Sequence, residues 1–215
     1  MSWRVLAVDT ASEYGSMALG LDGQILEEVP MHGPNGFDDL LFPQIEALLA
    51  GHGLELDSID CFASACGPGS FTGVRVGLAV MKGLATAMAK PMCAVSNLKA
   101  VASQGSGGMR AALFDARRGD IFGALYDASL DPLLEEMVMP LEQWLKLMPE
   151  GEIEFLGTNL APFEQALGAR PHRLVSRSLA GAVARLAMPD VARHPREIDA
   201  SYVRRCDAEM FWQDK

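Results

Sequence analysis

Residues 5–11, VLAVDTA, and residues 111–117, AALFDAR, decide the fold. Each is an apolar run that leads into an aspartate followed by a small residue. A glycine and a second apolar run come soon after each of them. A strand that ends in a turn and returns as a hairpin explains both copies. The pair therefore predicts an internal repeat, although ordinary strand chemistry is an alternative source of so short a similarity.

The first half of the chain contains further elements around a strand at residues 3–9. Asp22-Gly23 is a two-residue hairpin signal between the apolar runs 15–21 and 24–29, so the chain is expected to open with an antiparallel meander. Apolar spacing then predicts, in this order, a helix at 38–51, a strand at 59–65, a helix at 72–89, a strand at 92–95 and a short helix capped by Ser96.

The second half begins after a glycine-rich segment, 104–108, that is typical of a linker. Its pattern predicts strands at 110–114, 121–126, 135–139 and 153–156, and helices at 141–147, 160–167 and 179–187. Two similar halves indicate an α/β protein with duplicated βββαβα units. We expect an N-terminal lobe at 1–104 and a C-terminal lobe at 105–215, whose tail is free to pack back on the first lobe.

Composition and charge exclude several classes of protein. Of the 215 residues 49% are apolar and 21% are charged, so the chain can bury a core and is not disordered. A net charge of -10 repels phosphate backbones, so the chain should not hold nucleic acid strongly by itself. Its cysteines form no C-x-x-C pair, and no apolar run is both long and uncharged enough for a membrane span. We expect a soluble cytoplasmic protein with reduced thiols.

The most specific segment is GPGSFTGVR at residues 67–75. Its glycines allow the backbone to approach a ligand or another chain closely, and Ser70 and Thr72 are suited to cap the following helix. The free N–H groups of that helix would attract an anion. No Gly-Lys-Ser/Thr follows, so the segment is not a Walker A loop. A tight strand-to-helix turn without a ligand explains the segment equally well.

The helix expected at 72–89 carries only two charged residues, Arg75 and Lys82, seven positions apart on one face. A helix that is apolar nearly all round must be covered on more than one side. Burial inside one domain is one solution, and a subunit interface shared with the helix at 38–51 is the one we favour. The predicted contact residues are Leu41, Ile45, Leu48, Val74, Arg75, Gly77, Leu78, Met81, Lys82 and Ala85. A bulky residue at Gly77 is then expected to block pairing and to leave the monomer folded.

Asp9 and Asp115 end equivalent strands, where an actin-like or sugar-kinase-like protein would hold magnesium and phosphate. Thr10 and Arg117, close to them, are further candidates to face a phosphate. The simpler interpretation is that each aspartate only forms a turn. The four histidines are scattered without metal-ligand spacing, and no Ser/His/Asp or Cys/His arrangement is evident, so neither a metal site nor a hydrolytic nucleophile is predicted.

Five motifs, in order along nearly the whole chain, resemble the TsaB (YeaZ) family: VLAVDTAS at 5–12, GPGSFTGVRVGLAVMKGLA at 67–85, VSNLKAVA at 95–102, DARRGDIFGALY at 115–126 and SYVRRCDAE at 201–209. The resemblance implies the two-lobed actin/Hsp70/sugar-kinase-like (ASKHA) fold. It also implies a role in transferring a threonylcarbamoyl group to N6 of adenosine 37 in tRNA. Residues 128–195 match the family weakly and are assigned no role.

The resemblance also implies partners. In that system TsaB forms a heterodimer with TsaD, the catalytic paralogue, and a small ATPase, TsaE, joins them. The family forms homodimers when alone, and tRNA is expected to be reached only through the complex. We expect no tightly bound cofactor, and ATP or ADP at the partner interface remains an alternative.

A comparison within the family bears on catalysis. TsaD-like sequences carry an H-x-x-x-H metal pair where this chain has Val95–Val101 without a histidine, so a non-catalytic scaffold subunit is expected. Many relatives have a His-Ser-Glu-like stretch before the Leu-x-Pro of the first helix, where this chain has GFDDLLFP at 36–43, with Phe37 in place of that stretch; this suggests a more apolar edge of the interface. Two alternatives remain open: an ATP-dependent phosphotransferase of the same fold, and a metallopeptidase of the M22 glycoprotease type, for which ligands are not found.

Overall fold

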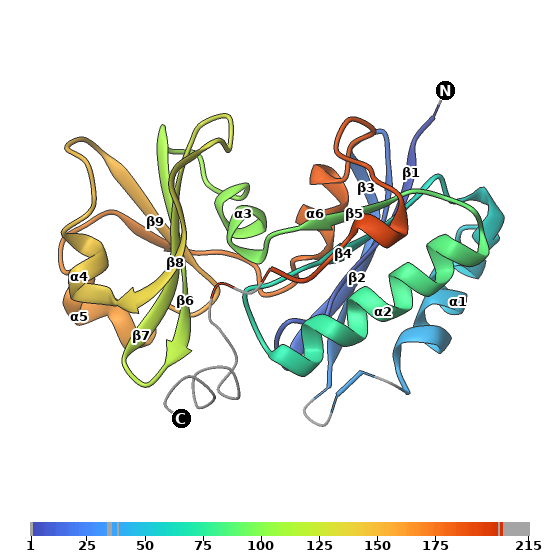
Figure 1. The fold of residues 1–215 in the computed structure, drawn as a ribbon, viewed down its shortest axis with the longest axis horizontal. Helices are drawn as coiled ribbons and strands as arrows, with labels where there is room; N and C mark the ends of the chain where they lie inside the picture. Colours follow the sequence, from blue (N-terminus) through green and yellow to red (C-terminus); the bar gives the residue numbers. More distant parts are fainter. Residues whose placement is uncertain (1, 34–35, 38, 202, 204–215) are drawn as a thin grey trace, which may run out of the picture. The chain divides into compact units, whose positions relative to one another are not determined.

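The computed structural model describes residues 2–33, 36–37, 39–201 and 203 (Figure 1). Contacts divide the chain into two compact units. Unit 1 comprises Met1–Ala100 and Ser176–Ala200, and unit 2 comprises Val101–Val175 and Ser201–Lys215. Residues 176–200, placed in the predicted C-terminal lobe with a tail free to pack back on the first lobe, fold with unit 1. Most of the SYVRRCDAE motif lies outside the described residues.

Unit 1 is built on a five-stranded sheet with the order β3-β2-β1-β4-β5. The first three strands form the predicted antiparallel meander, with Asp22 and Gly23 at positive φ in the hairpin turn, while β4 and β5 run parallel to β1. The strands are β1 (Arg4–Asp9), β2 (Tyr14–Leu21), β3 (Gln24–His32), β4 (Cys61–Ala65) and β5 (Met92–Val95).

Helices cover both faces of this sheet (Figure 1). On one face α1 (Leu41–Gly51) and α2 (Phe71–Ala87) share a core with Leu6 and Val8 of β1. On the other face α6 (Ala180–Leu186) packs against β1 and β2. A short helix, α3 (Asn97–Ala102), follows β5. Ser70 caps α2, because its hydroxyl accepts a hydrogen bond from the Gly73 amide at 3.2 Å.

Unit 2 repeats the same sheet. Its order is β10-β9-β6-β7-β8, so β6 to β10 take the places that β1 to β5 take in unit 1. This repetition confirms the duplicated βββαβα units, and two equivalent sheets agree with the two-lobed fold that the family resemblance implies. Its strands are β6 (Met109–Arg117), β7 (Asp120–Asp127), β8 (Pro132–Pro140), β9 (Ile153–Gly157) and β10 (His172–Leu174).

One face of the second sheet buries Trp144 and Phe155 in a compact core. The covering elements are α4 (Leu141–Leu145), α5 (Glu164–Leu167) and a 3-10 helix at Ala161–Phe163. The helix predicted at 160–167 is thus two short pieces. The strand β10 was not predicted, because its three residues are all exposed and carry no apolar alternation.

The predicted linker at 104–108 is a fixed turn. Glu154 of β9 accepts hydrogen bonds from the amides of Ser106 and Gly107, both at 2.8 Å, and from Arg173 Nε at 3.1 Å. Burial raises the pKa of this carboxyl, but the two amides and the Arg173 charge outweigh it and hold the pKa below its ordinary value. Among the helices of the described residues, none is both long and apolar enough to cross a membrane.

Candidate functional site

Most of the predicted contact residues are buried in the core of unit 1. Only Arg75 and Lys82 reach the surface, and the others are buried in the core between the helices and the sheet, so their assignment as contact residues is wrong. The buried ones are Leu41, Ile45, Leu48, Val74, Gly77, Leu78, Met81 and Ala85. The physical reason is that these positions, spaced three and four apart, form the stripe of each helix that faces the sheet.

Gly77 also faces the sheet and not a partner. A Cβ at this position would collide with the Thr10 hydroxyl and lie 3.1 Å from Ser64 Oγ. Thr10 follows β1 and Ser64 belongs to β4, so both lie on the side of α2 that faces the sheet. A bulky residue at Gly77 would therefore push α2 off the sheet. The expectation that such a variant stays folded and loses only its partner is corrected accordingly.

The opposite side of α2 is largely exposed, and most of its side chains are small or apolar. We call it the outer face of α2; it consists of Phe71, Thr72, Arg75, Val76, Ala79, Val80, Gly83, Thr86 and Ala87, of which the two valines are half-buried. Phe71 is 45% exposed, and the Arg75 guanidinium lies 3.7 Å from the centre of its ring. A Cβ on Gly83 would meet nothing within 4 Å. Phe42, at the start of α1, adds a second exposed aromatic ring at 51%.

Phe37 does not extend this exposed surface. Its side chain is buried in the unit 1 core, and its ring lies against the backbone of Gly15 and Gly33, neither of which has room for a Cβ. Phe37 therefore adds nothing to an apolar interface edge, and the exposed large apolar side chain of the 36–43 segment is Phe42.

The turn after β1 holds Asp9, which is fully buried. Its Oδ1 accepts hydrogen bonds from the Ala11 amide at 2.9 Å and from Asn97 Nδ2 at 3.1 Å. Burial raises the pKa of Asp9 to about 6; the two hydrogen bonds lower it in part, and the nearby Glu28 charge raises it further. The buried Asp9 carboxyl therefore stabilises the turn by accepting hydrogen bonds from the Ala11 amide and from Asn97.

Thr10 is also engaged within the protein. Its hydroxyl donates to the Gly73 carbonyl of α2 at 2.7 Å, and the Ser70 amide donates to the Ala11 carbonyl at the same distance. Cβ atoms on Gly69 and Gly73 would collide with the carbonyls of Ala11 and Thr10. The glycines of the 67–75 segment therefore let the start of α2 rest on the turn after β1, which favours the tight-turn interpretation of that segment.

Asn97, at the start of α3, is the site residue that sequence reasoning missed. Besides the bond that its Nδ2 donates to Asp9, its Oδ1 accepts from the Gly67 amide at 2.9 Å, and its backbone N–H donates to the Gly67 carbonyl at 2.8 Å. Its place just after a parallel strand was the available signal, because polar residues at the carboxyl ends of such strands converge. The buried polar side chains of the described residues gather here: Asp9, Thr10, Ser16, Ser64 and Asn97.

The equivalent turn of unit 2, between β6 and β7, is open. Asp115 is exposed, and its Oδ1 accepts from the Arg117 amide at 2.7 Å. Arg117 and Arg118 have φ of 68° and 57°, in the left-handed region that suits glycine better. Beside the turn is a cavity of about 420 Å³ lined by Asp115, Arg117, Arg118, Gly119, Asp120, Leu141, Pro162, Phe163 and Ala166.

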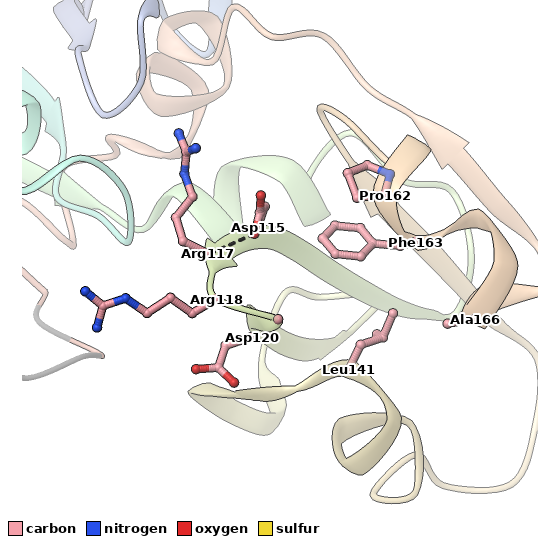
Figure 2. A pocket seen from close by; sticks show the side chains of 9 residues that line it. Asp115, Arg117, Arg118, Asp120, Leu141, Pro162, Phe163 and Ala166 are labelled. Carbon is pink, nitrogen blue, oxygen red and sulfur yellow. Dashed lines mark hydrogen bonds between the residues drawn. The ribbon is translucent and has the colours of Figure 1, made fainter.

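Figure 2 shows how these side chains are arranged. Phe163 and Leu141 form an apolar wall opposite the turn, whereas the side chains of Arg117 and Arg118 extend away from that wall. A phosphate-facing role of Asp115 and Arg117 stays a prediction. A phosphate-facing role of Asp9 and Thr10 also stays a prediction, and it would require their present hydrogen bonds to break first. Among the described residues, no group of three or more histidine, cysteine or acidic side chains is placed to hold a metal ion.

Comparison with known proteins shows which family this chain resembles. Residues 29–197 match the family model of TsaD, tRNA N6-adenosine threonylcarbamoyltransferase. The tRNA threonylcarbamoyladenosine biosynthesis protein TsaB of Bacillus subtilis (strain 168) is 30% identical over 171 residues, which cover 76% of this chain and 74% of that protein. TsaB of Escherichia coli (strain K12) is 37% identical over 127 residues, 57% of this chain and 54% of that protein, so this alignment spans about half the length of the relative.

A solved structure agrees with these relatives. A Pseudomonas aeruginosa protein with similarity to the peptidase YeaZ superposes with a TM-score of 0.81 at 26% identity, covering 94% of this chain and 100% of that protein.

Proposed function

Because the chain belongs to the TsaB (YeaZ) family, we propose that it is a non-catalytic subunit that binds and supports a TsaD-type threonylcarbamoyltransferase. Relatives in this family are named for threonylcarbamoyladenosine biosynthesis in tRNA. The matching family model is that of the transferase itself, so this chain and TsaD share a fold and are paralogues. The reaction supported would be transfer of a threonylcarbamoyl group to N6 of adenosine 37.

The position of Asn97 supports a non-catalytic role. TsaD-like sequences carry their metal-binding histidines in this part of the chain. Here the first turn of α3 presents an amide whose oxygen and nitrogen are already bonded to Gly67 and Asp9. A side chain held in this way organises the protein interior and is not available to a metal or a substrate.

The outer face of α2 carries the proposal, as the surface on which TsaD would dock. The helix has 17 residues and is about 25 Å long. Its outward residues are small or apolar apart from Arg75 and the neighbouring Lys82. Small residues let a partner helix come close, and exposed apolar rings such as Phe71 and Phe42 gain roughly 25 cal/mol for each Å² that they bury. The two charges would orient the partner at the rim more than they would add affinity.

The occupant that we propose is the paralogue. Two chains of one fold can pair through equivalent helices, and the same face would join two copies of this chain when TsaD is absent. The net charge of -10 supports contact with tRNA only through the complex. We also propose, from the family resemblance, that TsaE is a third component of the complex. Binding of ATP or ADP at the partner interface is a further proposal.

Gly83→Glu tests the docking surface. The glycine sits in open space on the outer face of α2, so the variant should fold normally, whereas a carboxylate buried against TsaD should weaken binding about 100-fold or more. Gly108→Glu is the matched control, because Gly108 is an exposed glycine with open space around it in unit 2. Light scattering after size exclusion and titration calorimetry with TsaD of the same organism give the readout. Unchanged affinity of Gly83→Glu would overturn the proposal.

An ATP-dependent phosphotransferase is the second candidate, and the open β6–β7 turn beside a cavity is the observation that favours it. The turn after β1 counts against it, because Asp9 and Thr10 are bonded within the protein. Titration of the isolated chain with ATP and magnesium separates the two, since only a phosphotransferase should bind the pair tightly. For the metallopeptidase alternative, the described part of the chain offers no supporting ligand cluster.

A further inference from the structure

The turn after β1 and the start of α2 are joined by hydrogen bonds at several points. Asn97 links the Asp9 carboxyl to the Gly67 amide, Thr10 donates to the Gly73 carbonyl, and the Ser70 amide donates to the Ala11 carbonyl. We infer that Asp9 and Asn97 are positioning residues, which fix the first turn of α2 and thereby the docking surface that it carries. This inference rests on the function proposed above.

The placement of polar groups is the first argument. Burying a polar group is unfavourable unless it is hydrogen-bonded, and a satisfied buried network specifies one arrangement of the segments that it joins. The buried polar side chains of the described residues all lie at the carboxyl ends of β1 and β4 or directly beside them. Ser64, for example, ends close to Gly77 on the inner side of α2. Thr10 and Ser64 therefore lie where α2 meets the sheet, and Asn97 joins Asp9 to Gly67, just before α2. Ser16 faces α6 instead, where its Oγ accepts a hydrogen bond from the Ala180 amide at 2.9 Å.

Close backbone contact is the second argument. Gly69 and Gly73 lie directly on the carbonyls of Ala11 and Thr10, with no side chain between them. A shift of the turn after β1 must therefore move the first turn of α2 with it. That first turn carries Phe71, whereas the later part of the helix is held by large apolar residues such as Met81.

The two halves of α2 are thus held by different means. Hydrogen bonds of Asp9, Asn97, Thr10 and Ser70 join the beginning to the turn after β1, whereas apolar packing, which starts at Val74, holds the rest. Loss of the Asp9 acceptor should loosen residues 67–73 and leave the second half of the helix unaffected. Since Phe71 and Arg75 belong to the outer face of α2, loosening should also reduce affinity for the partner.

The test compares Asp9→Ala with Asp9→Asn in the full chain. Alanine removes the acceptor for the Ala11 amide and for Asn97 Nδ2, whereas asparagine retains a carbonyl oxygen at the same place. Hydrogen exchange of residues 67–73 should accelerate about tenfold or more in Asp9→Ala and remain slow in Asp9→Asn. TsaD affinity should fall by a similar factor in the first variant only. Asn97→Ala should reproduce Asp9→Ala.

Val183→Ala supplies the control for general destabilisation. Val183 is fully buried in α6, on the opposite face of the sheet, so its truncation weakens unit 1 without touching α2. Equal loss of TsaD affinity in Val183→Ala would overturn the inference, as would slow exchange of residues 67–73 in Asp9→Ala. If exchange accelerates but Gly83→Glu binds TsaD normally, the docking surface is wrong, and the positioning role falls with it.

Discussion

Replacing Asp9 by asparagine should stabilise the chain at neutral and alkaline pH. Burial raises the pKa of the Asp9 carboxyl from 3.8 to about 6, an effect that hydrogen bonds from Ala11 and Asn97 only partly oppose. The folded chain therefore keeps the Asp9 proton to a higher pH than the unfolded chain does. Between about pH 4 and pH 6 the folded state binds more protons, so the free energy of unfolding falls as the pH rises.

The magnitude is set by the size of the shift. Roughly two pKa units at 1.36 kcal/mol each amount to about 3 kcal/mol, present as stability below pH 4 and lost above pH 6. Asparagine is neutral throughout and keeps an acceptor for the Ala11 amide. We expect Asp9→Asn to match the parent near pH 4 and to exceed it by up to about 3 kcal/mol at pH 8.

Urea unfolding followed by circular dichroism at pH 4, 6 and 8 measures the difference directly, and the other titrating groups cancel between the two proteins. Asp115→Asn is the control, because the equivalent carboxyl of unit 2 is exposed. A difference between Asp9→Asn and the parent that does not grow with pH would refute the argument from burial. A variant less stable than the parent at pH 8 would show that the carboxylate charge itself holds the turn.

The same contacts lead to three further predictions. Glu154→Gln should weaken the turn at Ser106 and Gly107 by about 1–3 kcal/mol and speed its hydrogen exchange, because the charged acceptor of both amides is lost; for the parent, this stability should disappear as the pH falls through the lowered pKa of Glu154. Gly77→Leu should lower the melting temperature sharply or prevent folding, whereas Gly83→Leu should keep it unchanged or raise it. Calorimetry should detect no tight binding of ATP and magnesium to the isolated chain; tight binding would favour the phosphotransferase.

The positions of most strands and the antiparallel meander of β1 to β3 were predictable, because short apolar runs and one hairpin signal determine them. The repeat of VLAVDTA and AALFDAR predicted two equivalent units, and the sheets have equivalent orders. The contact residues were not predictable in the same way, since a helix that is apolar nearly all round gives no periodicity from which to choose the buried side. Arg75 was the usable signal: positions 79 and 83, one and two turns later, share its exposed side, and the buried residues lie opposite.

The two aspartate turns show how much a local motif leaves undetermined. Asp9 and Asp115 end equivalent strands, yet the first is buried and the second exposed. The difference comes from the segment after the fourth strand of each unit. In unit 1 the glycines of the 67–75 segment bring α2 onto the turn, whereas in unit 2 Phe163 and its neighbours keep a cavity beside it. The same Asp motif therefore anchors a helix in one unit and borders a cavity in the other, so its role depends on the side chains of a distant segment.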